Sequence, residues 1–143
     1  MNPFRQLNDT YWVAPQINLE ALAEAAALGV KTVISNRPDG EEMGQLKAGQ
    51  IADAAREKGM QFLHLPMTGP PSPEQTEALI AQLAAEPGIT LGFCRSGTRS
   101  TIIWAFAMTR SGRLTPDEAI TAAGNAGYDI SQLRPMLAAQ TPG

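Results

Sequence analysis

Cysteine and histidine are scarce in this chain, which has 143 residues but only one of each. A single cysteine excludes an intramolecular disulfide and any metal site built from cysteines alone. One Cys with one His also falls short of the usual ligand set of a bound metal. We therefore expect no metal and no other cofactor, and the low cysteine content favours a reducing, cytoplasmic setting.

Long apolar runs are missing as well, since no stretch reaches the ~20 apolar residues of a membrane-spanning helix. Residues 1–6 lack the basic and apolar regions of a signal peptide. The formal net charge of −3 argues against a general nucleic-acid-binding protein. We expect neither a membrane nor a nucleic acid as a partner.

What the chain does contain is ordinary for a globular protein, with 43% hydrophobic and 17% charged residues. This composition and length predict one domain over residues 1–143, with a sizeable core and no repeat or linker. Apolar periodicity and turn residues divide it into alternating strands and helices. The expected strands are 11–14, 30–35, 60–65 and 89–94, and the expected helices are 19–28, 46–58, 73–85, 98–111, 116–124 and 129–139.

This alternation predicts an α/β fold with a mostly parallel central sheet of about four strands and helices on both faces. Several helix starts carry capping signals, namely Asn18, Ser72 before Pro73, and Thr115 with Glu118. In a parallel sheet the loops that follow the strands meet at one edge, where ligands bind. The loops 36–42, 66–72 and 94–99 should therefore converge.

The most informative stretch is a β-prone run that ends in Cys94 and is followed by a short loop and an apolar helix. A helix N-terminus carries about half a positive charge and unpaired N–H groups, so it binds anions and favours a thiolate. Arg99 is placed to fold back over the loop and offer a planar set of donors to an oxyanion. A buried inert thiol is the alternative, but two arginines seldom surround such a sulfur. The pattern predicts that Cys94 and Arg99 are catalytic and that the loop binds a small tetrahedral oxyanion through Arg95, Ser96, Gly97, Thr98 and Ser100.

Four further residues are candidates for accessory roles, and three of them, Arg37, Asp39 and His64, each have a structural alternative. Arg37 adds positive charge at the same edge or pairs with Glu41 or Glu42. Asp39 is a displaced general acid or an exposed turn residue. The side chain of His64 orients a substrate or is a hydrogen-bonded, partly buried strand residue.

Ser100, in the loop, also has two interpretations. Ser100 either donates a hydrogen bond to the Cys94 sulfur or serves in the first turn of the helix. Thr68 is considered below, because its interest depends on a resemblance to known proteins.

The stretches Thr32 to Glu41 and Phe62 to Met67 resemble the bacterial beta-lactamase-hydrolase-like phosphatase family. Over most of the chain the order of elements resembles a small dual-specificity-phosphatase-like fold. Members of that family are described as phosphatases or as sulfurtransferases, so the resemblance implies cysteine chemistry on an oxyanion without choosing the reaction.

Two departures from the phosphatase pattern favour sulfur transfer. Phosphatases of this fold have five residues between Cys and Arg, whereas Cys94 and Arg99 have four between them, which resembles the active-site loop of rhodanese-type sulfurtransferases. Phosphatases also protonate the leaving group from an Asp after the preceding strand. The matching position here is Thr68, and no Asp occurs between Gln61 and Cys94.

Our first hypothesis is therefore a sulfurtransferase, in which Cys94 takes sulfur from thiosulfate or a small persulfide and passes it to a thiol such as glutathione. The alternative is a phosphatase of the protein-tyrosine or dual-specificity type that works through a phosphocysteine. A third possibility is a non-catalytic sensor that binds an anion or a persulfide.

Overall fold

The computed structural model of the protein describes residues 3–142 and contains a five-stranded sheet. Its strands are β1 (Arg5–Gln6), β2 (Tyr11–Ala14), β3 (Val30–Ser35), β4 (Gln61–His64) and β5 (Ile89–Phe93). They lie in the order β1-β2-β5-β3-β4, with β1 antiparallel to β2 and the other neighbours parallel. The predicted α/β fold with a mostly parallel sheet is confirmed. The sequence missed β1, which is short and exposed.

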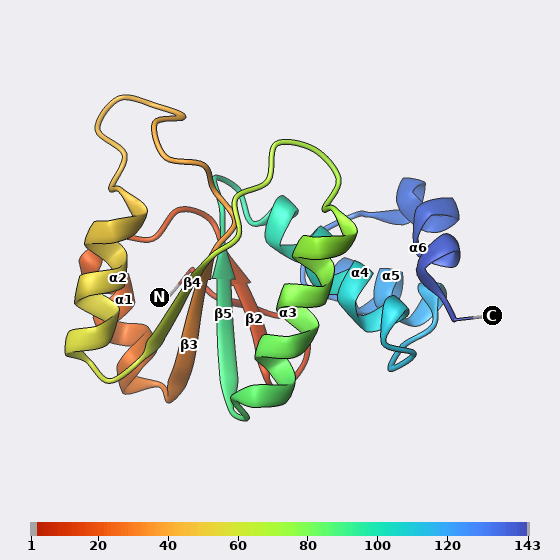
Figure 1. Cartoon of the computed structure of the whole chain (residues 1–143), viewed down its shortest axis with the longest axis horizontal. Helices are drawn as coiled ribbons and strands as arrows, with labels where there is room; N and C mark the ends of the chain where they lie inside the picture. The colour runs from red at the N-terminus through yellow and green to blue at the C-terminus, as the bar shows by residue number, and fades with distance from the viewer. Residues whose placement is uncertain (1–2, 143) are drawn as a thin grey trace.

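Helices cover both faces of the sheet, as predicted (Figure 1). One face carries α1 (Leu19–Ala27) and α2 (Ala48–Glu57). The other carries α3 (Pro73–Ala85), α4 (Thr98–Arg110), α5 (Pro116–Asn125) and α6 (Arg134–Gln140). The expected last helix, 129–139, is instead a 3-10 turn, η1 (Ser131–Leu133), that runs into α6.

Local capping explains why the helices begin where they do. The side chain of Asn18 accepts a hydrogen bond from the backbone N–H of Ala21 at the start of α1. Ser72 and Thr115 form capping boxes ahead of α3 and α5, and in both a proline occupies the first helical position. These contacts confirm the three caps predicted from the sequence.

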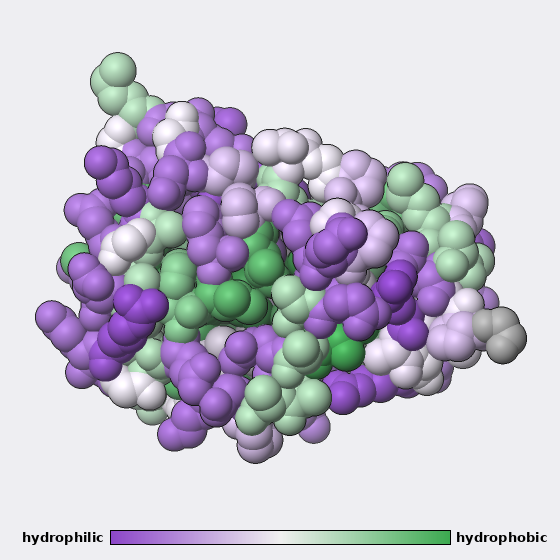
Figure 2. All heavy atoms as spheres, viewed as in Figure 1, coloured by the Kyte–Doolittle hydropathy of each residue, from purple (hydrophilic) through white to green (hydrophobic). Residues whose placement is uncertain are grey.

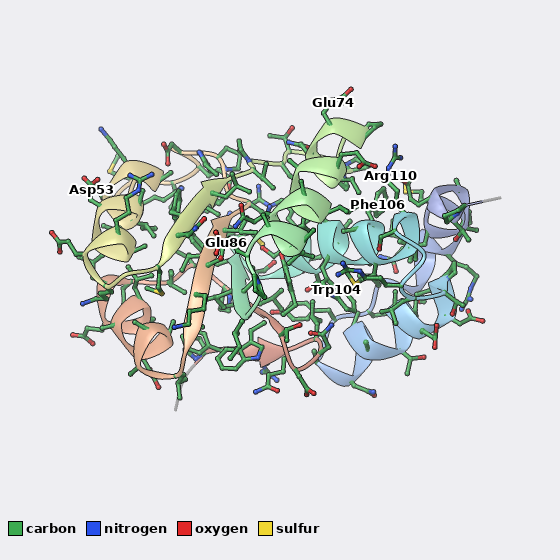
Figure 3. The ribbon with its side chains drawn as sticks, turned by 60° about the horizontal axis from the view of Figure 1, so that its bottom comes forward. Asp53, Glu74, Glu86, Trp104, Phe106 and Arg110 are labelled. Carbon is green, nitrogen blue, oxygen red and sulfur yellow. The ribbon has the colours of Figure 1, made fainter. Side chains whose placement is uncertain are left out.

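The core is divided by the sheet into two apolar clusters, and α4 is the centre of the larger one. Trp104 is fully buried and Phe106 nearly so, and both project from α4 (Figure 3). The surface view shows an apolar strip between the polar surfaces of the two helical layers, along the β4 edge of the sheet (Figure 2). Because α4 packs on β2 and β5 and also contacts α3, α5 and α6, its first turn is held firmly.

A pair of neighbouring isoleucines tests this account of α4. Ile103 has an exposed fraction of 0%, whereas Ile102 is half-buried. We expect Ile103→Ala to lower the free energy of unfolding by about 2–5 kcal/mol, because a fully buried side chain leaves a cavity. Ile102→Ala is the matched control, since the change in helix propensity is the same. Equal losses in chemical denaturation would contradict the proposed packing.

Candidate active site

The three predicted loops do meet at the carboxyl edge of the sheet, above β3, β4 and β5 (Figure 1). Hydrogen bonds tie them together there. The backbone N–H of Asn36 donates to Phe93 O at 2.8 Å, and the N–H of Met67 donates to Asn36 O at 3.1 Å. The convergence inferred from the strand pattern is confirmed, and it brings residues from positions 36 to 99 into one site.

Cys94 follows the last residue of β5 and is fully buried. Its Sγ accepts a hydrogen bond from the backbone N–H of Gly97 at 3.0 Å. Gly97 is the N-cap of α4, so the sulfur lies at the positive end of that helix. In the described part of the chain the N–H groups of Arg99 and Ser100 have no acceptor, which leaves two donors in the first turn for an anion.

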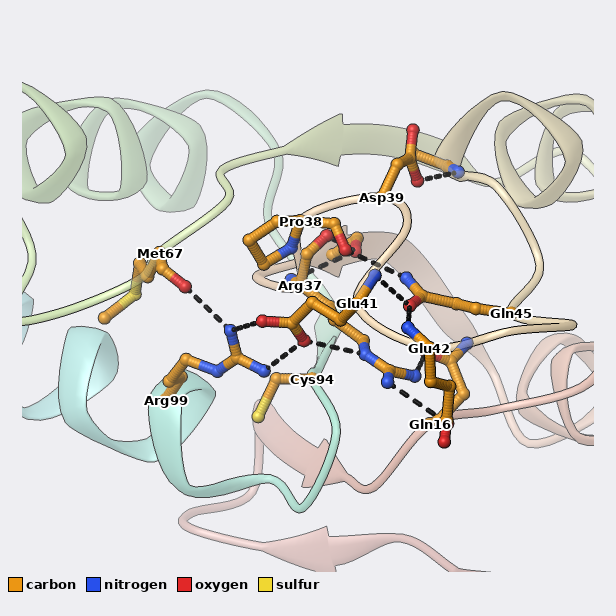
Figure 4. Close-up of polar contacts among 12 residues, drawn as sticks. Gln16, Arg37, Pro38, Asp39, Glu41, Glu42, Gln45, Met67, Cys94 and Arg99 are labelled. Atoms are coloured by element: carbon orange, nitrogen blue, oxygen red, sulfur yellow. Dashed lines mark hydrogen bonds and ion pairs between the residues drawn. The ribbon is translucent and has the colours of Figure 1, made fainter.

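Arg99 is held by its distal nitrogens (Figure 4). Nη1 and Nη2 donate to the two carboxylate oxygens of Glu41 at 2.8 and 2.7 Å, and Nη1 also donates to Met67 O at 2.7 Å. A guanidinium has five N–H donors, so Nε–H and one hydrogen of Nη2 remain. These two donors share an edge of the planar group, and the Cys94 side chain lies beside Arg99 in Figure 4. This edge can bind two oxygens of an oxyanion next to the sulfur.

Glu41 keeps its negative charge in this setting. The hydrogen bonds from Arg99, followed by those from Arg37, lower the pKa of Glu41 to about 2. In return the hydrogen bond to Glu41 raises the pKa of Arg99 against the opposing effect of burial, and the negative charges of Glu41 and then Cys94 raise it further. Glu41 thus orients the guanidinium as a fixed anion, and at neutral pH it has no proton to give.

Arg37 is buried, with an exposed fraction of 1%, and does not act as a free positive charge. Its Nε donates to Glu41 at 2.9 Å, Nη1 to Gln16 at 2.9 Å and Nη2 to Glu42 at 3.1 Å. The ion-pair interpretation of Arg37 is therefore correct. His64 is partly buried, and its Nε2 is 2.9 Å from Arg37 O, which agrees with its interpretation as a hydrogen-bonded strand residue.

Asp39 and Thr68 do not supply an acid beside the sulfur. Asp39 Oδ1 accepts a hydrogen bond from the N–H of Ala48 at the start of α2, and its side chain points away from Cys94 in Figure 4. This contact agrees with the interpretation of Asp39 as a loop residue, and its role as a displaced general acid stays a prediction that this geometry does not favour. Thr68 is exposed and lines a cavity beside Arg99.

Ser100 donates its one hydroxyl proton to Asn36 Oδ1 at 2.7 Å, so the bond from this hydroxyl to Cys94, one of its two interpretations, does not form. The Asn36 side chain in turn donates to Leu65 O at 3.0 Å. Both side chains are buried, and together they fasten the first turn of α4 to the ends of β3 and β4. Asn36 was not predicted, because its partners are distant in the sequence.

The remaining loop residues shape the backbone around the sulfur. Arg95 is exposed, and its carbonyl accepts a hydrogen bond from the N–H of Gln16 at 3.3 Å. The hydroxyl of Ser96 donates to Thr98 Oγ1 at 3.1 Å, which closes the turn that leads into α4.

Tyr128 is a second residue that the sequence analysis missed. Its hydroxyl donates to Ser96 O at 3.2 Å, and its ring lies where a side chain at Gly97 would project. Burial, followed by the negative charge of Cys94, raises the pKa of Tyr128. The residue comes from the segment between α5 and η1, and nothing in its local sequence indicates that it returns to the loop.

Two features are absent from the residues that the structure describes, a metal-binding cluster and a membrane-spanning helix. Across residues 3–142 no group of three or more His, Cys, Asp or Glu side chains could hold a metal ion. Within the same range no helix has the length and apolar character needed to cross a membrane.

Comparison with known protein families places this site in context. Residues 3–113 match the family model described as the phosphatase-like domain of beta-lactamase hydrolase-like protein. A beta-lactamase hydrolase-like protein of Xylella fastidiosa (strain Temecula1) is 31% identical over 141 residues, covering 95% of this chain and 32% of the relative. One from Agrobacterium fabrum is 28% identical over 126 residues, covering 87% and 29%. The chain thus spans about a third of the length of the curated relatives it matches.

Solved structures of similar fold are also described as phosphatases. A candidate phosphatase from Neisseria meningitidis z2491 superposes with a TM-score of 0.82 at 30% identity, covering 98% of this chain and 99% of that one. PTPMT1 in complex with PI(5)P gives a TM-score of 0.76 at 16% identity, covering 97% and 94%. Kinase associated phosphatase, with its catalytic-site cysteine replaced by serine, gives a TM-score of 0.73 at 15% identity, covering 96% of this chain and 91% of that one. The last two show that the fold is shared with dual-specificity-type phosphatases.

The two glycines at the ends of α4 test the shape of the loop. Gly97 and Gly112 both have positive φ, +97° and +76°, but only at Gly97 would a Cβ meet another group, the Tyr128 ring and hydroxyl. We expect Gly112→Ala to lower the free energy of unfolding by about 1–2 kcal/mol. Gly97→Ala should cost more, about 3 kcal/mol, because Tyr128 must also move. Equal losses in chemical denaturation would show that Tyr128 does not support the loop.

The neighbouring residues Glu41 and Glu42 test the ion pairs that Glu41 forms with Arg37 and Arg99, which we call the Glu41 bridge. At neutral pH we expect Glu41→Gln to lower the free energy of unfolding by about 1–3 kcal/mol, because Arg37 and Arg99 both lose a charged acceptor. Glu42→Gln is the control, since the Glu42 side chain is half exposed and accepts from Arg37 but not from Arg99.

The same pair of variants has a pH signature. The folded-state pKa of Glu41, about 2, lies below its ordinary value of 4.5. Its stabilisation is therefore complete above pH 4.5 and is lost as the pH falls toward 2. Wild type and Glu42→Gln should lose stability across this window, and Glu41→Gln should lose less. If the free energy of unfolding fell by the same amount between pH 4.5 and pH 2 in all three proteins, the Glu41 bridge would not contribute to stability.

Proposed function

The chain belongs to the family of phosphatase-like domains of beta-lactamase hydrolase-like proteins, and on that premise we propose that it is a cysteine-dependent phosphatase. The observation that carries the proposal is the pairing of Cys94 Sγ, at the N-terminus of α4, with a fixed Arg99 that keeps one edge free. The sequence analysis put sulfur transfer first and a phosphatase second. The comparisons support the phosphatase better.

In the first step the Cys94 thiolate attacks the phosphorus of a phosphate monoester. An S–P bond forms, the ester P–O bond breaks, and the leaving alkoxide or phenoxide takes a proton from water. In the second step water attacks the phosphocysteine, the S–P bond breaks, and phosphate and the thiolate are released. This sequence needs no second cysteine, which suits a chain with only one.

Charge stabilisation comes from the loop and from Arg99. The free Nε–H and Nη2–H would hold two equatorial oxygens, and the N–H groups at the start of α4 would face a third. These donors are already in place, since Glu41 and Met67 O fix the guanidinium and Asn36 fixes the helix start through Ser100. Little reorganisation is then required when negative charge develops.

The carboxyl groups near Cys94 are not placed to protonate the leaving group. Glu41 is ionised, and Asp39 is engaged with Ala48 on the far side of its loop. Without a protonated carboxyl group, esters of acidic alcohols such as phenols should react much faster than alkyl esters. The substrate class we propose is therefore a monoester with a good leaving group, or one that brings its own proton donor.

Sulfur transfer remains a second candidate, and one specific observation favours it. Four residues separate Cys94 and Arg99, and sulfite departs from thiosulfate without protonation, so the ionised Glu41 would be no handicap. Cys94 would take the outer sulfur, sulfite would leave, and an external thiol would accept the sulfur from the Cys94 persulfide.

A paired assay decides between the two reactions. We expect aryl phosphate hydrolysis by the wild-type protein and a loss of at least about 1000-fold in Cys94→Ser, because the nucleophile is removed. The second arm supplies thiosulfate with glutathione and follows sulfite release.

Each outcome has a definite meaning. Sulfite release without phosphate release would replace the proposed phosphatase by the sulfurtransferase. If neither product forms while iodoacetamide still labels Cys94, the protein would be the non-catalytic anion sensor.

A further inference from the structure

A cavity of about 260 Å³ opens beside Arg99, between α4, α6 and the loop that follows β4. Apart from Arg99, its wall carries no charged group. The apolar side chains that face it are Pro70, Ile102, Phe106, Leu133 and Met136. The reactions described above do not use this cavity.

The cavity and the anion site share one stripe of α4. Arg99, Ile102 and Phe106 are spaced by three and four residues, so they lie on the same face of the helix. From Arg99 to Phe106 the helix rises about 10 Å. A single molecule could therefore place its anionic group on the guanidinium and an apolar chain along the same stripe.

We propose that this cavity binds the aliphatic part of the substrate, so that the substrate is an amphiphilic anion with a chain of about four to eight carbons. Because an alkoxide is a poor leaving group, such a monoester is one of those that bring their own proton donor. This proposal rests on the proposed function, since it assumes a phosphate group at Arg99. A cavity of about 150 Å³ holds benzene, so the observed volume has room for a chain of this size.

The chemistry of the wall disfavours strongly polar substituents. Thr68 and Arg99 are the polar side chains in the lining, so most hydroxyl groups of a sugar or nucleoside placed along the apolar part would be buried without partners, which is costly. Inorganic thiosulfate has no organic group to fill it. Met136, which is 41% exposed, lies at the α6 side of the cavity, and its unbranched, flexible side chain can adapt to chains of different length.

The test is calorimetric binding of methyl-, butyl-, hexyl- and octylphosphonate to the wild-type protein, because a C–P bond is not hydrolysed. Once the chain reaches the cavity, each added methylene should tighten binding about three- to fourfold. Hexylphosphonate should thus bind about tenfold more tightly than butylphosphonate.

Two variants locate the chain. In the double variant Ile102→Thr/Met136→Gln, Gln is close to Met in volume, whereas Thr keeps the branch of Ile at Cβ but is smaller. The double variant makes the wall more polar, and it should weaken hexylphosphonate about tenfold without changing methylphosphonate. Met136→Gln alone, at an exposed position, should show part of this loss. The control is Leu28→Gln, which changes an exposed side chain at the end of α1, on the other face of the sheet.

The outcomes separate this proposal from the proposed function. Equal affinity along the series would overturn the cavity assignment while the anion site stands. A chain-length effect that survives in the double variant and in Met136→Gln would place the chain elsewhere and also overturn it. If no phosphonate binds, the phosphate chemistry itself fails, and the cavity assignment fails with it.

Discussion

The bidentate ion pair between Glu41 and Arg99 is the contact on which the site depends. It joins the loop after β3 to the first turn of α4, 58 positions further along the chain. The same carboxylate also accepts from the buried Arg37, so one anion neutralises part of the charge of two guanidinium groups. Without it, Arg37 would be buried with fewer acceptors, and the Arg99 guanidinium would keep the bond to Met67 O but lose the bidentate contact that sets its orientation toward Cys94.

In this ion pair some N–H donors of Arg99 bind protein acceptors, and the others stay open for a substrate. Glu41 and Met67 O take the distal end of the guanidinium, while the side edge stays open beside the sulfur. A substrate anion therefore need not displace Glu41 in order to bind. The carboxylate acts through Arg99 as a positioning residue, and its low pKa follows from that role.

Much of the fold follows from local sequence signals, but the site partners do not. The caps at Asn18, Ser72 and Thr115 depend on contacts within three residues, so they were predictable. Strand β1 was missed because two exposed residues leave no apolar pattern. Cys94 and Arg99 were singled out by one loop sequence, and the structure places both at the sheet edge.

The choice among three carboxylates shows where sequence reasoning stops. Asp39, Glu41 and Glu42 lie in one loop, and the turn chemistry of that loop does not tell which of them faces the sulfur. Asp39 accepts from the start of α2, Glu41 pairs with two arginines, and Glu42 pairs with one. Those partners come together only through the parallel sheet, so the assignment requires tertiary structure.

The electrostatics and the apolar wall point to the same kind of substrate. Near the sulfur, the charge of Arg99 is already balanced in part by Glu41, so the attraction for a bare inorganic anion is weaker than an unpaired arginine would give. Added affinity must then come from contacts beyond the anionic group, and the apolar cavity that Arg99 borders offers them. A partly neutralised anion site with an adjoining apolar cavity would discriminate in favour of organic esters over free phosphate, and free phosphate is the product that must leave in the proposed reaction.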